Sequence, residues 1–312
     1  MTQTLLHQIL DYANRADPLA ESDSEESALP PSFLRLDPPE HDRLRRMTNR
    51  HFGPPHSPHR VDGMRPELAD TLAASLDPDP DADPAERGKG AHEARMQLGM
   101  YLAGLIEERR KNPGDDMLSQ LATAKGQDGP MTTMELLSTA ALLLIAGHET
   151  TVNLITNGML TLLRNPDVLR RLRTEPRLAV PIVEELLRFE PPVQLLPQRT
   201  TLADIEVRGV TIPKGSTLWL LLASGNRDPP QRFENPDRFD PDRPDVQHLG
   251  LGSGIHSCFG APLARLEAQL ALSELARRLE NPRLLDDPPP YRQNAVLRGP
   301  RQLGIACDGI RP

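Results

Sequence analysis

The sequence predicts a mainly helical protein with a minor β region, and two patterns carry that expectation. Apolar residues recur at three- and four-residue spacing over long stretches, the longest of which covers residues 132–164. Alternating apolar residues are confined to a short part of the chain after residue 200. Aromatic residues make up only 3% of the sequence, so the core must be built from Leu, Ala, Val and Ile. A chain of 312 residues can bury a large core, and we expect a single domain over 1–312.

The first part of the chain alternates helical patterns with polar segments. Expected here are helices at 4–14, 65–76, 91–111 and 115–121 and a surface loop at 17–26. A further helix follows Pro38 and Pro39, and it carries His41 and Arg45 on one face because they are four residues apart. Taken alone, that face is a solvated basic surface. Residues 77–84 contain four aspartates and three prolines, which predicts an exposed linker rather than packed structure.

Two longer helices are expected in the middle of the chain. The first, 132–164, begins with a capping-box pattern formed by Thr132 and Glu135. Its residues 140–146 have no polar face, so we expect this part to be buried all round. The second, 177–190, is amphipathic. Its expected inward residues are Ile182, Val183, Leu186 and Leu187.

The middle of the longest helix carries the run Ala146-Gly-His-Glu-Thr-Thr151. An acid and two hydroxyl groups within a buried helix need polar partners. One interpretation is a threonine bonded to the helix carbonyls beside a solvent-facing Glu149. The zinc motif H-E-x-x-H is absent, because no second histidine follows at the required spacing.

A β region is expected between residues 200 and 222. Residues 205–212 alternate in character and turn at Gly209, which predicts a hairpin. The run 217–222 is apolar and predicts a buried strand.

The stretch from His248 to Gly260 contains three glycines that allow tight turns before Cys258. A helical pattern follows, with apolar residues on or near one face, namely Leu263, Leu266, Leu270, Leu275 and Leu279. Cys258 thus lies at a helix start, where backbone N–H groups and the helix dipole favour a thiolate. Without a second Cys or His at chelating spacing, a thiolate suits a haem iron better than zinc. The alternatives are a small buried hydrophobe or a disulfide with Cys307, and the latter is disfavoured in a chain with two cysteines and no secretory signal.

The run Leu251-Gly-Ser-Gly-Ile-His-Ser-Cys-Phe-Gly260 resembles the haem-binding loop F-G-x-G-x-H-x-C-x-G of the cytochrome P-450 family. The resemblance implies a cytochrome P-450 fold and a haem b held through the Cys258 thiolate, with Gly252, His256 and Gly260 at the cofactor. Leu251 departs from the family, which has an aromatic residue at that position beside the iron–sulfur bond.

Further motifs extend the resemblance over nearly everything from about residue 30 onward. The run at 146–151 resembles the oxygen-activation motif A-G-x-[DE]-T-T. It implies Ala146 and Gly147 against the cofactor, and Glu149 and Thr150 as the residues that manage protons. Other matches imply propionate anchors at His41, Arg45, Arg199 and His256. The pair Glu185 and Arg188, with Arg238 as a third member, matches the structural E-x-x-R network, and segments 192–198 and 294–303 match the lining of the substrate pocket.

The chain is shorter than the family by about a quarter. Counterparts of the first helix and opening strands are missing from the sequence, and the linker at 77–84 stands where the family has several helices. One of these helices covers the substrate pocket, so we expect weaker substrate discrimination and more uncoupled reduction of oxygen.

These features together predict a bacterial-type haem-thiolate monooxygenase of secondary metabolism. It would insert one atom of dioxygen into a small hydrophobic organic substrate by hydroxylation or epoxidation. A separate ferredoxin or flavodoxin with its NAD(P)H reductase would supply the electrons. The alternative is a catalytically silent scaffold that supports a partner enzyme, or a non-functional fragment. A net charge of −8 argues against nucleic acid, and the absence of an 18-residue apolar run or signal pattern predicts a soluble, cytoplasmic protein.

Overall fold

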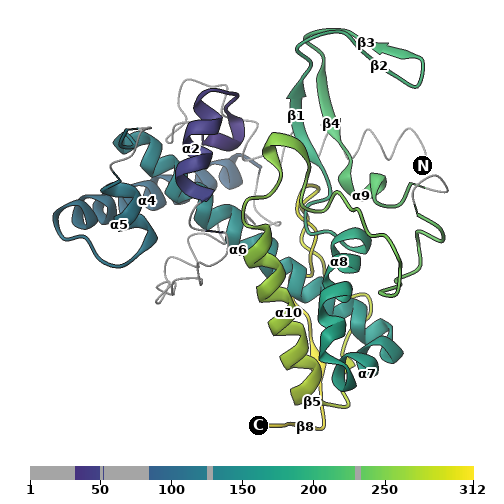
Figure 1. The fold of residues 1–312 in the computed structure, drawn as a ribbon. Coiled ribbons are helices and arrows are strands. Elements are labelled where there is room, and N and C mark those ends of the chain that lie inside the picture. The colour runs from purple at the N-terminus through teal and green to yellow at the C-terminus, as the bar shows by residue number, and fades with distance from the viewer. Residues whose placement is uncertain (1–31, 50–51, 53–83, 125–128, 229–232) are drawn as a thin grey trace. The chain divides into compact units, whose positions relative to one another are not determined.

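The computed structural model describes residues 32–49, 52, 84–124, 129–228 and 233–312 (Figure 1). Their helices are α2 (Glu40–Asn49), α4 (Pro84–Lys111), α5 (Met117–Ala122), α6 (Thr133–Arg164), α7 (Pro166–Thr174), α8 (Ala179–Phe189), α9 (Leu222–Gly225) and α10 (Ala261–Arg278), with 3-10 turns η2 (Phe33–Arg35), η3 (Pro176–Leu178) and η4 (Gly254–His256). Their strands are β1 (Leu196–Thr200), β2 (Ile205–Val207), β3 (Val210–Ile212), β4 (Thr217–Leu220), β5 (Leu279–Glu280), β6 (Arg283–Leu284), β7 (Ile305–Ala306) and β8 (Gly309–Ile310). The mainly helical fold class with a minor β region is confirmed.

Some expected elements lie on residues that the structure does not describe. The predicted helices at 4–14 and 65–76, the loop at 17–26 and residues 77–83 of the linker lie outside the described residues.

The described residues form two compact units. One, called here the α4 unit, holds the described residues up to Glu149 together with residues 259–263. The other, the α8 unit, holds residues 150–258 and 264–312 where they are described.

The core of the α4 unit is made of hydrocarbon side chains from α2, α4, α5 and the first half of α6. On α4, Leu98, Leu102 and Ile106 are buried at four-residue spacing, which is one face of a helix. The ring of Phe33 packs edge-on against Phe259 with centroids 5.3 Å apart. The helix predicted at 91–111 is confirmed, although it begins earlier, at Pro84.

The N-terminus of α6 has the capping box that the sequence predicts. The backbone N–H of Thr132 donates to Glu135 Oε2 at 2.8 Å, and the backbone N–H of Glu135 donates to Thr132 Oγ1 at 3.2 Å. The expected burial of 140–146 on all sides is wrong. Residues 140–142 are buried, whereas 143–146 are half-buried and Gly147 is exposed. An apolar run shows that a helix face can be buried, but the number of elements packed around it depends on the fold.

The core of the α8 unit forms where the second half of α6 meets α8 and α10. Gly158 permits this close packing, because a Cβ there would lie 2.9 Å from Leu272 and 3.0 Å from Leu186. The helix predicted after Gly260 is confirmed as α10, but its buried stripe consists of Ala268, Leu272 and Ala276. The leucines at 266 and 270 are exposed instead. Of the other predicted leucines, Leu275 and Leu279 are half-buried and pack against this core, so the leucine spacing indicated the buried face only in part.

Helix α7 was not anticipated. Asn165 ends α6, and Pro166 then occupies the first position of α7, where a proline costs no hydrogen bond. The sequence shows Asn165-Pro166 as a stop signal, and the same pair also starts the next helix. Helix α8 agrees with the prediction in place and in its inward residues.

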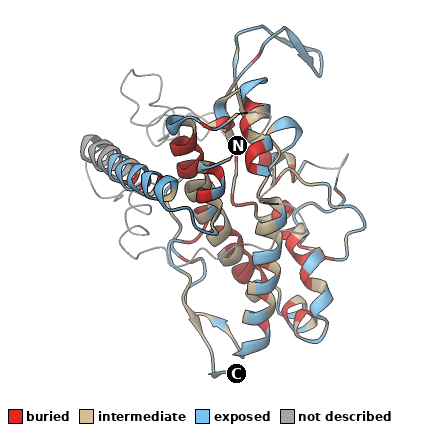
Figure 2. Cartoon of the chain, turned by 60° about the vertical axis from the view of Figure 1, so that its left-hand side comes forward, coloured by how far each residue is buried: buried red, intermediate tan, exposed pale blue. Residues whose placement is uncertain are grey.

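The β region consists of short antiparallel pairs. Strands β2 and β3 form the predicted hairpin, with Arg208 and Gly209 at φ 50° and 79° in its two-residue turn. Figure 2 shows that this hairpin is exposed over nearly its whole length. Strand β4 pairs with β1, but its residues are exposed or half-buried, so the prediction of a buried strand at 217–222 is wrong. A two-stranded sheet leaves its faces open unless other elements cover them. No helix in the described part of the chain is long and apolar enough to cross a bilayer.

Candidate functional site

The loop that carries Cys258 is closed by its own backbone. The N–H of Cys258 donates to the carbonyl of Leu251 at 2.8 Å, and η4 lies between them. Gly252 and Gly254 have φ of 67° and 71°, a region that residues with a Cβ rarely adopt. Because Leu251 contributes its carbonyl, the absence of an aromatic side chain at this position leaves the turn intact.

This loop presents Cys258 three residues before α10 begins. The cysteine is exposed and is not joined to Cys307 in a disulfide, so both the buried-hydrophobe and the disulfide interpretations are wrong. No group of three His, Cys, Asp or Glu side chains within the described ranges could hold a metal ion. A single exposed sulfur at a helix start fits one axial bond to a cofactor metal and does not fit a site built from protein ligands alone.

The first half of the loop is fixed to the C-terminal part of α8. The N–H of Leu249 donates to Asn226 Oδ1 at 2.7 Å, and Asn226 Nδ2 donates to the carbonyl of Leu187 at 3.3 Å. Gly250 lies directly on that carbonyl, since a Cβ at this position would be 2.2 Å from Leu187 O. Glycine is required at 250 because the two backbones touch.

Glu184 lies on the same helix and binds two side chains from either side of the cysteine. Arg265 donates through Nε and Nη2 at 2.6 and 2.9 Å, and His248 Nε2 lies 3.1 Å away. Burial raises the pKa of Glu184, but the hydrogen bonds from His248 and Arg265 outweigh it and lower the pKa to about 2. Glu184 is therefore an anion at neutral pH. Sequence patterns did not single it out, because one acid next to another on a helix has no distinctive spacing.

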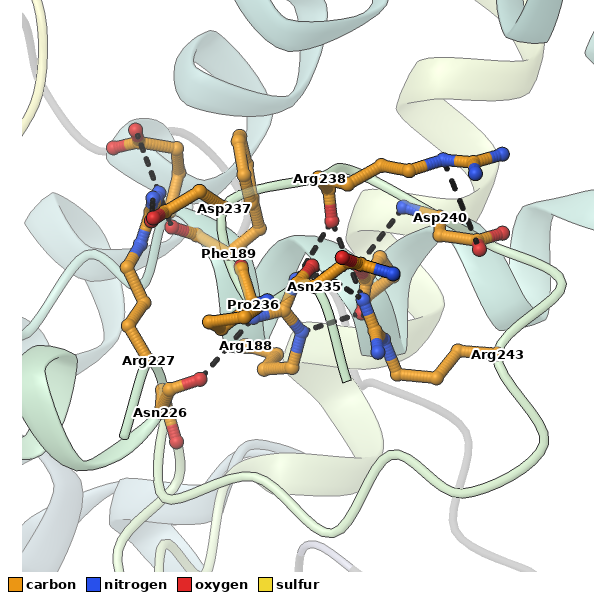
Figure 3. Close-up of polar contacts among 12 residues, drawn as sticks. Arg188, Phe189, Asn226, Arg227, Asn235, Pro236, Asp237, Arg238, Asp240 and Arg243 are labelled. Carbon is orange, nitrogen blue, oxygen red and sulfur yellow. Dashed lines mark hydrogen bonds and ion pairs between the residues drawn. The ribbon is translucent and has the colours of Figure 1, made fainter. Parts of the chain in front are cut away.

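Beneath the loop, Glu185 and Arg188 form the predicted pair, and both are completely buried. Arg188 Nε and Nη2 donate to the Glu185 carboxylate at 2.7 Å each (Figure 3). The remaining N–H groups of Arg188 reach the carbonyls of Asn226, Pro236 and Arg238 at 2.8–3.1 Å. Full hydrogen bonding of this kind is what makes a buried charge tolerable.

The prediction that the Arg238 side chain is the third member of this network is wrong. Its side chain is 72% exposed and lies 4.0 Å from Asp240, and only its carbonyl reaches Arg188. The third member is Arg243, which is 9% exposed and 3.5 Å from Glu185 (Figure 3). Asn235, at φ 47°, forms the turn that ends at Arg238, so this arginine lies on the outer side of the bend.

The predicted oxygen-side residues lie in the middle of α6. Glu149 is 8% exposed, so the interpretation as a solvent-facing acid is wrong. Gly147 is exposed, and a Cβ there would meet nothing within 4 Å. Ala146 and Thr150 are half-buried. The helix therefore has open space at Gly147, which suits a flat group placed against it.

The expected propionate anchors are distributed over both units. In the α4 unit, His41 is 1% exposed, with Nδ1 2.8 Å from Asp42 Oδ1 and its ring against Phe33. Arg45, on the same helix α2, is half-buried. In the α8 unit, Arg199 lies on β1 and His256 in η4, both half-buried. Their roles toward a cofactor remain predictions, as does that of Gly260, which is half-buried just before α10.

The two segments predicted to line the substrate pocket lie side by side. The N–H of Gln194 donates to the carbonyl of Val296, and that of Arg298 to the carbonyl of Pro192, both at 2.8 Å. Two buried asparagines of α6, at 153 and 157, hold the second segment and Arg292, which lies two residues before it. Asn153 Oδ1 accepts from Arg292 at 2.8 Å, and Asn157 Nδ2 donates to the carbonyl of Arg298 at 2.9 Å.

These two asparagines are not among the residues predicted from the sequence. The sequence pattern that could have predicted them is the four-residue spacing of two side-chain amides on the apolar side of a long helix. Each buried amide there must find a hydrogen-bond partner. Gly299 completes the contact, because a Cβ there would lie 2.1 Å from Asn153 Oδ1. The segment is thus fixed to α6 one turn after Thr150.

The chain is similar to known proteins over most of its length. The family model described as Cytochrome P-450 matches residues 61–305. Cytochrome P-450 monooxygenase PikC of Streptomyces venezuelae is 38% identical over 95% of this chain and 80% of its own length. The solved structure of the bacillaene polyketide synthase cytochrome P-450 PksS from Bacillus subtilis 168 has a TM-score of 0.82 and 29% identity, covering 90% of this chain and 82% of that one. CYP164A2 of Mycobacterium smegmatis, in a ligand-free crystal structure, has a TM-score of 0.78 and 35% identity and covers 98% of this chain.

Proposed function

The chain belongs to the cytochrome P-450 family, whose members are monooxygenases, and we propose that it uses haem b and that Cys258 would hold the iron. The observation that carries this proposal is the exposed Cys258 at the start of α10, on a loop closed by its own backbone. When bound, the haem supplies reductive activation of dioxygen, one atom of which enters the substrate while the other leaves as water. Cys258 would hold the haem through its sulfur, and a thiolate ligand would suit this chemistry because it is electron-rich.

The residues of α6 supply the acid–base side of this chemistry. In the proposal, the hydroxyl of Thr150 donates a hydrogen bond to dioxygen, and the carboxylate of Glu149 passes protons toward it. The burial of Glu149 supports this role, because a carboxylate away from bulk water can transfer protons along a defined route. The open face at Gly147 leaves room for the ring of the cofactor.

Cationic and polar side chains are proposed to hold the propionates. These are His41, Arg45, Arg199 and His256, which can form charge-assisted hydrogen bonds with carboxylates. Gly252 and Gly260 let the backbone approach the cofactor closely. This assignment also proposes that the two units act as one cytochrome P-450 domain over 1–312.

The substrate is proposed to be a small hydrophobic organic molecule of secondary metabolism, hydroxylated or epoxidised at a carbon. The names of the relatives support this class, since PksS is described as a polyketide synthase cytochrome P-450 and another relative as mycinamicin IV hydroxylase/epoxidase. Electrons are proposed to come from a ferredoxin or flavodoxin with its NAD(P)H reductase, because the sequence contains no flavin or iron–sulfur motif. The cytoplasmic location stays a prediction.

The test is the absorbance spectrum of the dithionite-reduced protein with carbon monoxide. A long-wavelength Soret band is expected, and it should disappear in Cys258→Ser and persist in the matched control Cys307→Ser. If the wild-type protein takes up no haem, the silent or fragment alternative is correct.

A second variant separates cofactor binding from folding. Gly147→Ala adds a methyl group that meets nothing in the protein, so the free energy of unfolding without haem should hold or rise by up to about 1 kcal/mol. If the ring of the cofactor lies against this face, haem affinity should fall at the same time. Unchanged haem affinity in this variant would place the cofactor elsewhere.

A further inference from the structure

The loop that carries Cys258 is fixed at both ends by a single carboxylate. His248 lies at the start of the loop and Arg265 lies seven residues after the cysteine, on α10. Both bind Glu184, on α8, at distances from 2.6 to 3.1 Å. A shift of either flanking residue would break hydrogen bonds to the same group, so the spacing of the two loop ends depends on Glu184.

The contacts of His248 define which of its nitrogen atoms carries the proton. The backbone N–H of Gly250 donates to His248 Nδ1 at 3.1 Å, so Nδ1 is an acceptor. The proton therefore lies on Nε2, which donates to Glu184 Oε2. The imidazole bridges the carboxylate and the loop backbone, and the side chain of His248 is only 4% exposed.

Arg265 makes the second contact with Glu184, from α10. Its guanidinium forms a bidentate pair with the Glu184 carboxylate, a geometry that a lysine cannot reproduce. The hydrogen bonds to Glu184 raise the pKa of Arg265, and burial lowers it. The carboxylate thus holds α10 close to the point at which this helix begins, three residues after Cys258.

We propose that Glu184 is a positioning residue for Cys258, acting through His248 and Arg265. This assignment rests on the proposed haem-thiolate function for its effect on the cofactor. The arrangement of the loop itself does not depend on haem. The two parts can therefore be tested separately.

The arrangement is tested by hydrogen exchange of the amides of Gly250, Gly252 and Cys258 in the full chain, measured with and without haem. Glu184→Gln and His248→Phe should increase exchange of these amides by about tenfold or more, because the loop loses its attachment to α8. The matched control is Asp242→Asn, which removes a bidentate pair with Arg171 that does not touch the loop. It should leave the three amides unchanged. Equal exchange in Glu184→Gln and Asp242→Asn would overturn the proposal.

The effect on the sulfur is tested through the haem. In Glu184→Gln, part of the long-wavelength Soret band of the reduced carbon monoxide complex should shift to shorter wavelength, because a displaced thiolate is lost as a ligand. Arg265→Gln should give a smaller shift of the same kind, because it removes one of the two attachments to Glu184. Arg265→Lys keeps the positive charge but cannot form both hydrogen bonds, so its spectrum and its amide exchange should resemble those of Arg265→Gln.

The Arg265→Lys comparison separates the two-point attachment from the effect of charge alone. The side chain of Arg265 is 35% exposed, so both Arg265 variants are expected to fold even if Glu184→Gln does not. Wild-type amide exchange in Arg265→Lys would overturn the role of the bidentate contact, because lysine keeps only the charge. If the wild-type protein binds no haem, the proposed function fails, and exchange in the apoprotein still decides the arrangement.

Discussion

The α8 unit and the α4 unit are stabilised in different ways. The α8 unit buries charge, since Glu185 and Arg188 are both inaccessible to solvent and fully hydrogen-bonded. The ion pairs of the α4 unit lie nearer the surface, as in Arg109–Asp116 and Lys111–Glu107, and its core is hydrocarbon.

We relate this difference in stabilisation to the Cys258 loop, which belongs to the α8 unit. The Cys258 loop contains three glycines before the cysteine and buries little side chain of its own, so its position must come from directional contacts. Hydrogen bonds have such direction, whereas apolar packing tolerates small shifts at low cost. A buried ion pair contributes little net stability compared with apolar residues of the same volume. The polar network beneath the loop is therefore explained by positioning rather than by stability.

The largest expected effect is that of Arg188→Ala. Removing this guanidinium leaves Glu185 buried without its main partner, and such a loss costs about 3–5 kcal/mol in the free energy of unfolding. Urea-induced unfolding followed by circular dichroism measures the change. The control, Arg171→Ala, removes an exposed bidentate pair with Asp242 and should cost about 1 kcal/mol or less. Similar losses in the two variants would remove the distinction between buried and exposed charge.

The next effect is at the contact between two backbones. Gly250→Ala places a methyl group 2.2 Å from Leu187 O, and neither backbone can yield without moving the loop. A destabilisation of about 2–3 kcal/mol is expected, measured by the midpoint of urea unfolding. Gly104→Ala on α4 should act in the opposite direction, with a gain of up to about 1 kcal/mol, because its new methyl group meets nothing within 4 Å. A loss at Gly104 would contradict the description of α4.

A pH-dependent effect is expected for Glu184. Its pKa falls from 4.5 to about 2 on folding, so its stabilising contribution is complete above pH 4.5 and is lost as the pH falls toward 2. The upper limit is about 3 kcal/mol, and screening reduces it because the side chain is 25% exposed. The stability difference between wild type and Glu184→Gln should therefore shrink between pH 4.5 and 2. A difference that is constant over this range would show that the carboxylate charge has no part in it.

The smallest effect tests the α4 unit. Thr132→Ala removes one half of the capping box of α6 and should cost about 1 kcal/mol in thermal or urea unfolding. The neighbouring Thr133→Ala loses only an exposed hydrogen bond from Arg110 and should stay within about 0.5 kcal/mol. Equal losses at the two positions would mean that the cap does not hold this helix end.

Local patterns were sufficient for several elements. The capping box at Thr132, the hairpin turn at Gly209 and the glycine loop before Cys258 were all predicted, because each depends on residues a few positions apart. Other predictions failed where distant segments decide. Arg243 replaced Arg238 in the buried network because the course of the chain after Asn235 brings the later arginine inward.

The sequence by itself determined the helical class, the family and the cysteine that the proposed chemistry needs. Periodicity and motif spacing are properties of neighbouring residues, so they can be read without a fold. Only the tertiary structure decided which polar groups meet across the chain. Glu184 meets Arg265 over 81 positions, and Asn153 meets Arg292 over 139. Such contacts depend on how helices pack, and that packing is set by the whole core rather than by any single segment.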